Sequence, residues 1–243
     1  MRIRKVYLEE TVSTNDVLLN AADGDDSDIL VVYTDYQTHG RGQGGNGWES
    51  ERGKNLLFSI LLHPVELEID CWFVLSMAIA LSIRKVLGEY ADGFVVKWPN
   101  DIYWHDKKIS GTLMESKIKG KTIGSCVLGC GVDINQQTFL SDAPNPVSLY
   151  NIIGVDTYTS EVLDKIVAAM AKYVEIVGKH DYECIKEEYM QVLYRRDGYH
   201  NYRDKDGAFR AKICDVALDG IITMEDDGGG IRRYSFKEVS CIF

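Results

Sequence analysis

Features that mark several classes of protein are missing from this chain of 243 residues. It has no apolar run long enough to span a membrane, and residues 1–10, MRIRKVYLEE, lack the apolar core of a secretory signal, so we expect a cytoplasmic protein. Its six cysteines contain no C-x-x-C pair, which favours buried, reduced thiols over metal ligands or disulfides. Because 27 basic residues face 37 acidic ones, the net charge of −10 argues against broad binding to nucleic acid.

The composition that is present, 45% hydrophobic and 26% charged, is that of a folded chain with a sizeable core. Hydrophobic periodicity predicts strands over residues 4–9, 29–36, 55–62 and 94–98, and a hairpin that turns around Lys119–Lys121. It predicts helices from Ser13 or Thr14 through Ala22, and over residues 69–90, 162–177 and 184–193. After Tyr194 the sequence is polar and turn-rich, with short strands near 208–216, 220–224 and 231–236. We therefore expect a main domain over 1–193 and a small β-barrel-like domain over 194–243.

The stretch THGRGQGGNGW, residues 38–48, contains a G-x-G-x-x-G string. A dinucleotide-binding loop needs a helix after the glycines, but the strand pattern NLLFSILL follows here. A kinase-type flap would need H-R-D and D-F-G segments, and a Walker loop needs G-K-[ST]; the sequence has none of these. What remains is a long loop whose glycines let backbone N–H groups approach an anion, with Arg41 as a forked donor for phosphate or carboxylate. We expect it to order over an anionic ligand and to be mobile without one.

A second stretch, KWPNDIYWHDKKISG, residues 97–111, places Lys97, Asn100, Asp101 and Lys108 around one turn. Taken alone, this pattern is more typical of a hairpin with solvated charges. Beside the glycine–arginine loop it favours a cationic pocket that also holds a carboxylate.

Four motifs together carry a resemblance to a known family. STND (residues 13–16), QTHGRGQGGNGW (37–48), KWPNDIYWHDKKISG (97–111) and GCGVDIN (129–135) follow the order found in biotin–protein ligases. The chain resembles the stand-alone bacterial type without an N-terminal DNA-binding domain, because the first motif starts at residue 13. The resemblance implies an α+β fold: a mixed sheet with flanking helices, like the class II synthetase-like catalytic domain of biotin and lipoate ligases, plus a small C-terminal SH3-like β-barrel.

The resemblance also implies a reaction. Biotin and ATP would form biotinyl-5′-AMP with the help of Mg²⁺, and the biotinyl group would pass to a lysine of a carboxylase biotin carrier domain. The implied catalytic residues are Lys108, Arg41 and Asp101. The implied biotin-binding residues are Ser13, Thr14, Asn15, Gln37, Arg41, Gly42, Gln43, Lys108 and Gly111, and the implied ATP-binding residues are Arg41, Trp48, Lys97, Asn100 and Asn135. No protein metal ligands and no specific DNA binding are expected, and a homodimer is possible.

Two positions depart from the family pattern. Gln43 stands where some members carry a second arginine, and Asp133 stands where asparagine is usual, so a carboxylate would face the phosphates unless it pointed away or toward Mg²⁺. Three other interpretations stay open: a lipoate–protein ligase of the same general fold, a non-catalytic biotin-binding or regulatory module, and a generic nucleotide-binding protein.

Overall fold

A computed structural model describes residues 1–21, 27–64, 66–141 and 143–242, excluding the side chain of Gln43. The strands are β1 (Ile3–Thr11), β2 (Ile29–Gln37), β3 (Leu56–Leu62), β4 (Phe94–Lys97), β5 (Asp101–Trp104), β6 (Lys107–Lys119), β7 (Thr122–Val132), β8 (His200–Asp204), β9 (Gly207–Val216), β10 (Ile222–Asp226), β11 (Ile231–Tyr234) and β12 (Ser240–Cys241). The helices are α1 (Thr14–Ala21), α2 (Phe73–Leu87), α3 (Leu149–Ile153), α4 (Thr159–Gly178) and α5 (Tyr182–Gln191), with 3₁₀ turns η1 (Gln43–Gly45) and η2 (Ile69–Cys71). No helix within the described ranges is both long and apolar enough to cross a membrane.

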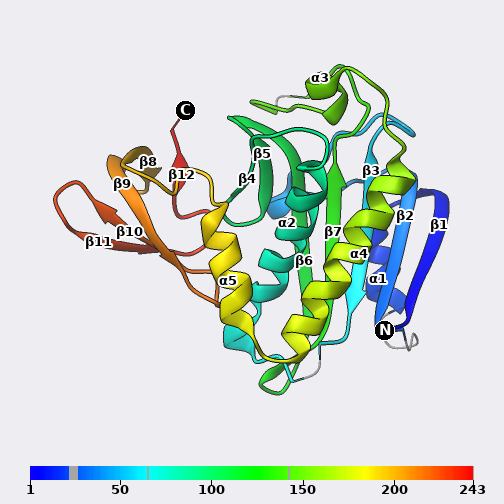
Figure 1. The fold of residues 1–243 in the computed structure, drawn as a ribbon, viewed down its shortest axis with the longest axis horizontal. Helices are drawn as coiled ribbons and strands as arrows, with labels where there is room; N and C mark the ends of the chain where they lie inside the picture. Colours follow the sequence, from blue (N-terminus) through cyan, green and yellow to red (C-terminus); the bar gives the residue numbers. More distant parts are fainter. Residues whose placement is uncertain (22–26, 65, 142, 243) are drawn as a thin grey trace.

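The main sheet has seven strands in the order β1-β2-β3-β7-β6-β5-β4 (Figure 1). β1 pairs with β2 in parallel, and every other neighbouring pair in this sheet is antiparallel. The sheet is therefore mixed, with flanking helices, which confirms the predicted α+β fold.

Both faces of this sheet are covered, and the alternation of side chains in β2 shows how. Ile29 and Val31 belong to the larger core, which includes α2, α4 and α5, whereas Leu30 and Val32 belong to a smaller core beneath α1. Because successive strand residues point to opposite faces, one buried strand serves both cores. In Figure 1, α2, α4 and α5 lie over one face of the sheet, with the blue α1 behind it.

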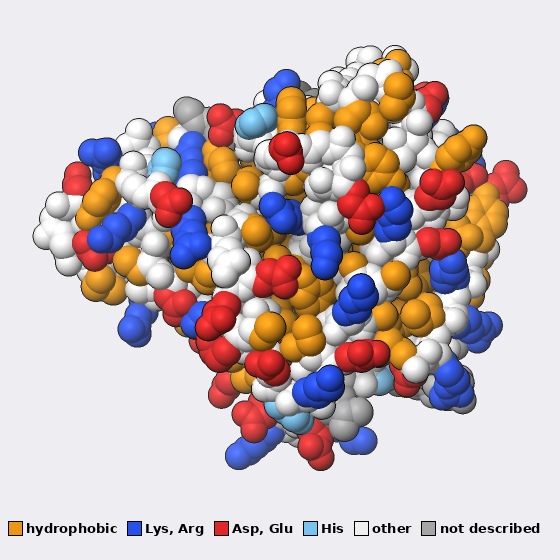
Figure 2. All heavy atoms as spheres, viewed as in Figure 1, with side chains coloured by type: hydrophobic (Ala, Val, Ile, Leu, Met, Phe, Trp, Pro, Cys, Tyr) orange, Lys and Arg blue, Asp and Glu red, His pale blue; other side chains and the backbone are white. Residues whose placement is uncertain are grey.

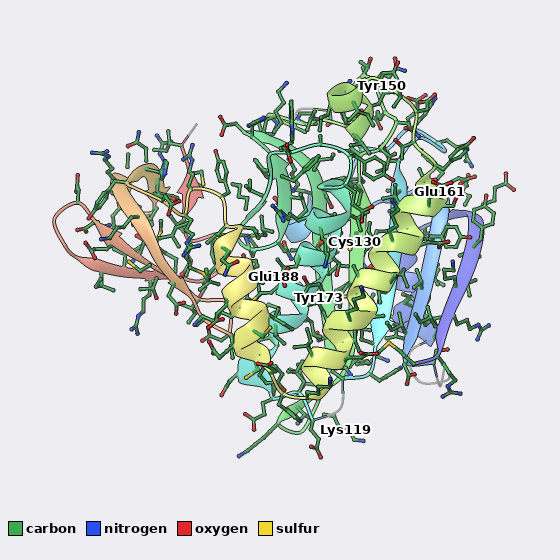
Figure 3. The ribbon with its side chains drawn as sticks, in the orientation of Figure 1. Lys119, Cys130, Tyr150, Glu161, Tyr173 and Glu188 are labelled. Carbon is green, nitrogen blue, oxygen red and sulfur yellow. The ribbon has the colours of Figure 1, made fainter. Side chains whose placement is uncertain are left out.

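Helices α4 and α5 are amphipathic and pack against one another. Tyr173 on α4 donates to Glu188 Oε1 on α5 at 2.8 Å, and the two labelled side chains come from adjoining helices in Figure 3. Over the solvent side of these helices, basic and acidic side chains are interspersed (Figure 2), as expected for a solvated helical face.

A second, antiparallel sheet with the order β11-β10-β9-β8-β12 forms the C-terminal part of the chain, and it fits a small β domain. An aromatic cluster joins it to the main domain. The Phe236 ring lies 5.6 Å from the Trp72 ring, 5.5 Å from the Phe73 ring and 5.4 Å from the Trp98 ring, measured between centroids. Trp98 Nε1 also donates to the carbonyl of Gly220 at 3.0 Å. The KWPND segment is thus packed directly against the C-terminal sheet.

Several element predictions need correction. β8 lies in a segment whose sequence predicts polar turns. Only Tyr202 of its five residues is buried, so the strand has little of the apolar alternation that would predict it. β5, β12 and α3 were also not predicted. The helix expected over residues 69–90 begins as a 3₁₀ turn and ends at Leu87, and α5 starts two residues before its predicted position. The predicted end of α1, Ala22, lies outside the described residues.

The cysteine prediction holds only in part. Cys126 and Cys130 are buried in the larger core (Cys130 is labelled in Figure 3), and burial raises the pKa of each thiol to about 12. Cys184 and Cys214 are exposed, so the expectation of buried thiols is wrong for these two. All six thiols are free, and no disulfide forms.

Candidate active site

A cavity of about 890 Å³ opens on the face of the main sheet that carries α1. Its wall brings together the start of α1, the glycine loop, the segment after β4 and residues 139, 141 and 143–146, with Lys237 from the turn between β11 and β12. Of the residues predicted to form the site, these line the cavity: Ser13, Thr14, Asn15, Gln37, Arg41, Gly42, Trp48, Asn100, Asp101, Lys108 and Gly111.

The floor of the cavity consists of strand backbone without side chains. In β7, Cys130 and Val132 point into the larger core, so Gly129 and Gly131 face the cavity. A Cβ atom at Gly129 would lie 1.9 Å from Asn15 Oδ1, and one at Gly131 would lie 2.3 Å from Trp48 Cε2. The site therefore requires glycine at both positions. The sequence carries this signal as two glycines spaced by two within an apolar strand.

Gly111 has the same role on β6. It pairs with Gly131 across the two strands, and a Cβ atom there would meet both Lys108 Nζ and the Trp48 ring at 3.1 Å. Trp48 consequently lies against the floor. Its Nε1 is buried and has no hydrogen-bond partner among the described residues, which marks a polar atom that a ligand or water can satisfy.

A buried polar network fixes one end of the cavity. The backbone N–H and the hydroxyl of Thr14 both donate to Gln37 Oε1, at 2.7 and 3.0 Å. Ser59 Oγ lies 2.7 Å from the Thr14 hydroxyl and donates to Asn15 Oδ1 at 2.6 Å. Ser13, Thr14 and Asn15 are each at most 3% exposed, and Gln37 on β2 and Ser59 on β3 hold Thr14 and Asn15 in place. Ser59 is a network member that the sequence motifs did not indicate.

Arg41 lies at the mouth of the cavity within a folded loop. The loop closes through hydrogen bonds from Gly42 N to Asn46 O (2.6 Å) and from Trp48 N to Gly40 O (3.1 Å). One guanidinium nitrogen of Arg41 lies 2.7 Å from Asp16 Oδ1 and 2.9 Å from Glu115 Oε2. Two carboxylates on α1 and β6 therefore hold the loop arginine.

Lys108 and Asp101 form the charged centre of the cavity. Lys108 Nζ lies 2.8 Å from Asp101 Oδ2, and their side chains are 33% and 23% exposed. The ammonium also lies 5.7 Å from the centre of the Trp48 ring. The backbone of Lys108 is fixed on both sides, since its N–H donates to Asn145 O and its carbonyl accepts from Val147 N. This places a positioned cation beside a carboxylate, above the glycine floor.

Asp133 also lines the cavity and is only 4% exposed. Burial raises the pKa of its carboxyl well above the usual range; the positive charge of Lys108 opposes this shift, and Glu49 adds to it. Asn55 Nδ2 donates to Asp133 Oδ1 at 3.0 Å. Because burial favours the neutral acid, Asp133 can occupy an asparagine position without presenting a full charge to phosphate groups.

Lys97 and Asn135 lie elsewhere. Neither lines the cavity, unlike the other nucleotide-binding candidates. The Asn135 side chain donates to Thr157 O and accepts from Thr157 N, both at 2.9 Å, so it fixes a loop. The Lys97 ammonium lies 5.0 Å from the Tyr103 ring centre. The side chain of Gln43 falls outside the described part of the chain.

Glu49 and Lys237 are charged cavity residues that the motifs do not predict. Glu49 accepts hydrogen bonds from the backbone N–H groups of Leu140 and Ser141, each at 2.8 Å, and so ties this part of the wall to the glycine loop. Burial alone would raise the pKa of Glu49, but hydrogen bonds, the first from Ser141, lower it below its usual value. Lys237 lies in the turn between β11 and β12 of the C-terminal sheet.

Known proteins are similar to this chain in sequence and in fold. Residues 7–133 match the model of the biotin/lipoate A/B protein ligase family. The bifunctional ligase/repressor BirA of Bacillus subtilis is 26% identical over 238 residues, covering 95% of this chain and 72% of that protein. The human biotin–protein ligase is 35% identical over 212 residues, covering 83% of this chain and 29% of that one.

Among solved structures, the biotin protein ligase of Aquifex aeolicus in complex with biotin and ATP is similar to this chain with a TM-score of 0.79 and 25% identity. The match covers 98% of this chain and 97% of the other. The family match spans more than half of the chain and reaches from β1 to Asp133 at the end of β7. The chain therefore belongs to the biotin/lipoate A/B protein ligase family and is a ligase enzyme.

Proposed function

We propose that the chain joins biotin to a lysine of a carrier domain of a biotin-dependent carboxylase, by way of biotinyl-5′-AMP made from ATP. The observation that supports this most directly is the combination of a rigid polar array with a positioned cation over one glycine floor. The likeness to an Aquifex aeolicus ligase that binds biotin and ATP supports the same choice of substrates.

The polar array suits the ureido ring of biotin. That ring offers one carbonyl acceptor and two N–H donors. Ser13, Thr14 and Asn15 supply hydroxyl and amide groups. Those of Thr14 and Asn15 are already held by Gln37 and Ser59, and Ser13 is buried beside them, so little ordering accompanies binding. The valeryl chain would then run across the glycine floor toward Lys108, bringing its carboxylate to the cation.

In the first step, an oxygen of the biotin carboxylate attacks the α-phosphorus of ATP. An O–P bond forms, the bond to the β-phosphate bridging oxygen breaks, and pyrophosphate leaves with the electron pair. Two anions must meet for this reaction, so cations between them lower the barrier. Lys108 is placed for this role, and Arg41 would join it by exchanging Asp16 and Glu115 for a ligand anion.

In the second step, the ε-amine of the carrier lysine attacks the acyl carbon, an amide forms, and AMP leaves. The amine must lose a proton before it attacks. Asp101 would orient the incoming lysine and accept that proton, because its carboxylate lies in the cavity 2.8 Å from Lys108 and remains 23% exposed. The glycine loop would exclude water from the mixed anhydride meanwhile.

Mg²⁺ would enter with the nucleotide. Within the described residues, no group of three or more His, Cys, Asp or Glu side chains could hold a metal ion. The ion would be held mostly by phosphate oxygens, where it would offset the negative charge of the triphosphate. Asp101 and Glu49 are the carboxylates of the cavity that would complete its shell, since burial favours the neutral form of Asp133.

A single assay tests the proposal and its lipoate rival. The purified chain is mixed with ATP and Mg²⁺ and with either biotin or lipoate, and pyrophosphate release is measured without a carrier. We expect release that depends on biotin, and biotin attached to one lysine when a carrier domain is added. Release that depends on lipoate alone would refute the choice of substrate. If both acids are inactive, the chain is not an activating ligase for either.

A further inference from the structure

The C-terminal sheet contributes a cation to the cavity. Lys237 lines the cavity together with the glycine loop. A Cβ atom added at Gly44 would lie only 1.7 Å from Lys237 Nζ, so the lysine lies directly over the loop at a residue without a side chain. Lys237 follows Gly44 by 193 positions in the sequence and yet approaches it in space.

The backbone holds Lys237 in place at a conformational cost. Its φ of +69° lies in the left-handed region, which glycine tolerates and lysine adopts rarely. The turn is fixed on both sides, since Ser235 N donates to Glu238 Oε2 at 2.7 Å and Phe236 packs among Trp72, Phe73 and Trp98. A lysine kept in a strained turn that faces a cavity indicates a role for its ammonium group.

The charges of the cavity indicate what that role is. Three cationic side chains line it, and two of them are already paired: Arg41 with Asp16 and Glu115, and Lys108 with Asp101. In the part of the chain that the structure describes, no ion pair is found for Lys237. Its charge is therefore available to a ligand without breaking an existing pair.

The location favours the outer phosphates of ATP over the biotin carboxylate. Lys237 is exposed, whereas the array for the ureido ring is buried and Lys108 is paired with Asp101 next to the glycine floor. The leaving pyrophosphate must face solvent to depart. We propose that Lys237 is a nucleotide-binding residue that contacts the β- and γ-phosphates of ATP, an assignment that rests on the proposed function for the nucleotide but not for the acid.

Calorimetric titration of the full chain with ATP and Mg²⁺ tests this inference directly. Lys237→Gly removes the ammonium and relieves the positive φ, so loss of fold does not confuse the result. We expect about tenfold weaker ATP binding, equivalent to about 1.4 kcal/mol. AMP and biotin should bind within about twofold of wild type, since neither carries β- or γ-phosphates. Lys237→Gly should also bind inorganic tripolyphosphate more weakly, by about the same factor as ATP.

Two controls separate charge from structure. Lys237→Arg keeps a cation and should bind ATP close to wild type, while Lys205→Gln removes an exposed lysine from the β8–β9 turn, outside the cavity, and should have no effect. The inference is overturned if Lys237→Gly binds ATP within twofold of wild type. It is also overturned if Lys237→Gly binds AMP and ATP with equal losses of affinity, or if Lys237→Arg binds ATP as weakly as Lys237→Gly does. None of these readouts needs biotin turnover, so a failed biotin assay leaves the outcome interpretable.

Discussion

Replacing Lys108 by alanine should slow formation of the adenylate by about 10- to 150-fold. A charge-assisted hydrogen bond is worth about 1.5–3 kcal/mol, and each ~1.4 kcal/mol is a factor of ten in rate. Lys108 is only 33% exposed, so solvent screens it incompletely. The lower limit applies if water replaces the ammonium, and the upper limit applies if two anions are left facing one another.

The structure also shows a complication that a second variant resolves. Lys108→Ala leaves Asp101 without its partner at 2.8 Å, and an unpaired carboxylate would itself repel biotin and ATP. In Asp101→Asn that repulsion is absent. If Lys108 acts on the substrates, Lys108→Ala should still slow the reaction at least about tenfold in the Asp101→Asn background, a loss of about 1.4 kcal/mol.

The assay is biotin-dependent exchange of pyrophosphate into ATP without a carrier, so any role of Asp101 in the transfer step does not enter. Lys119→Ala is the matched control, because Lys119 is exposed at the far end of the same strand, β6 (Figure 3). Exchange by Lys108→Ala within a factor of two of wild type would remove Lys108 from the site. Full recovery in the double variant would reduce its role to neutralising Asp101.

Three further predictions concern the floor, the buried acid and the loop. Gly131→Ala should push the Trp48 ring off the floor, with at least about a tenfold loss of exchange activity while the melting temperature stays within a few degrees; unchanged Trp48 fluorescence and activity would contradict this. Asp133→Asn should be more stable than the wild type at neutral pH, and urea unfolding should show this difference shrinking toward about pH 4. The pKa of Asp133 is raised in the folded chain, so above about pH 3.9 the unfolded chain loses this proton while the folded chain keeps it, which lowers the stability of the wild type. A stability difference that does not change with pH would contradict this prediction. Hydrogen exchange at residues 40–47 should slow when biotin or biotinyl-AMP binds, and equal protection with and without ligand would end the idea of a lid.

How far the sequence predicts this molecule depends on the range of the interactions involved. The long apolar strands and helices could be predicted because β2 and β3 are nearly continuous apolar runs and α4 repeats its apolar residues with a helical period. β8 could not, because its side chains are mostly exposed and the strand is defined by pairing with β9. Local pattern therefore identifies elements with a buried face, and not those fixed by their partners.

The same distinction applies to the site. Ser13, Thr14 and Asn15 are adjacent in sequence and were identified together, and the structure brings them to Gln37 in one cavity. Ser59 is an ordinary serine in an apolar strand until β3 places it between Thr14 and Asn15. Lys237 lies in a turn that no motif marks. Conversely, Asn135 sits in a motif yet bonds to a distant loop, so motif membership alone does not place a side chain in the site.

The glycine floor also limits how this enzyme can evolve. Every other amino acid carries a Cβ atom, and at Gly129 that atom would coincide with the Asn15 amide, while at Gly131 it would coincide with the Trp48 ring. No single amino-acid replacement at either position is therefore silent, because each displaces either Asn15 on α1 or the Trp48 ring of the glycine loop. New acid specificities are more accessible through the walls, at residues 143–146 or at the mouth beside Arg41, than through the floor.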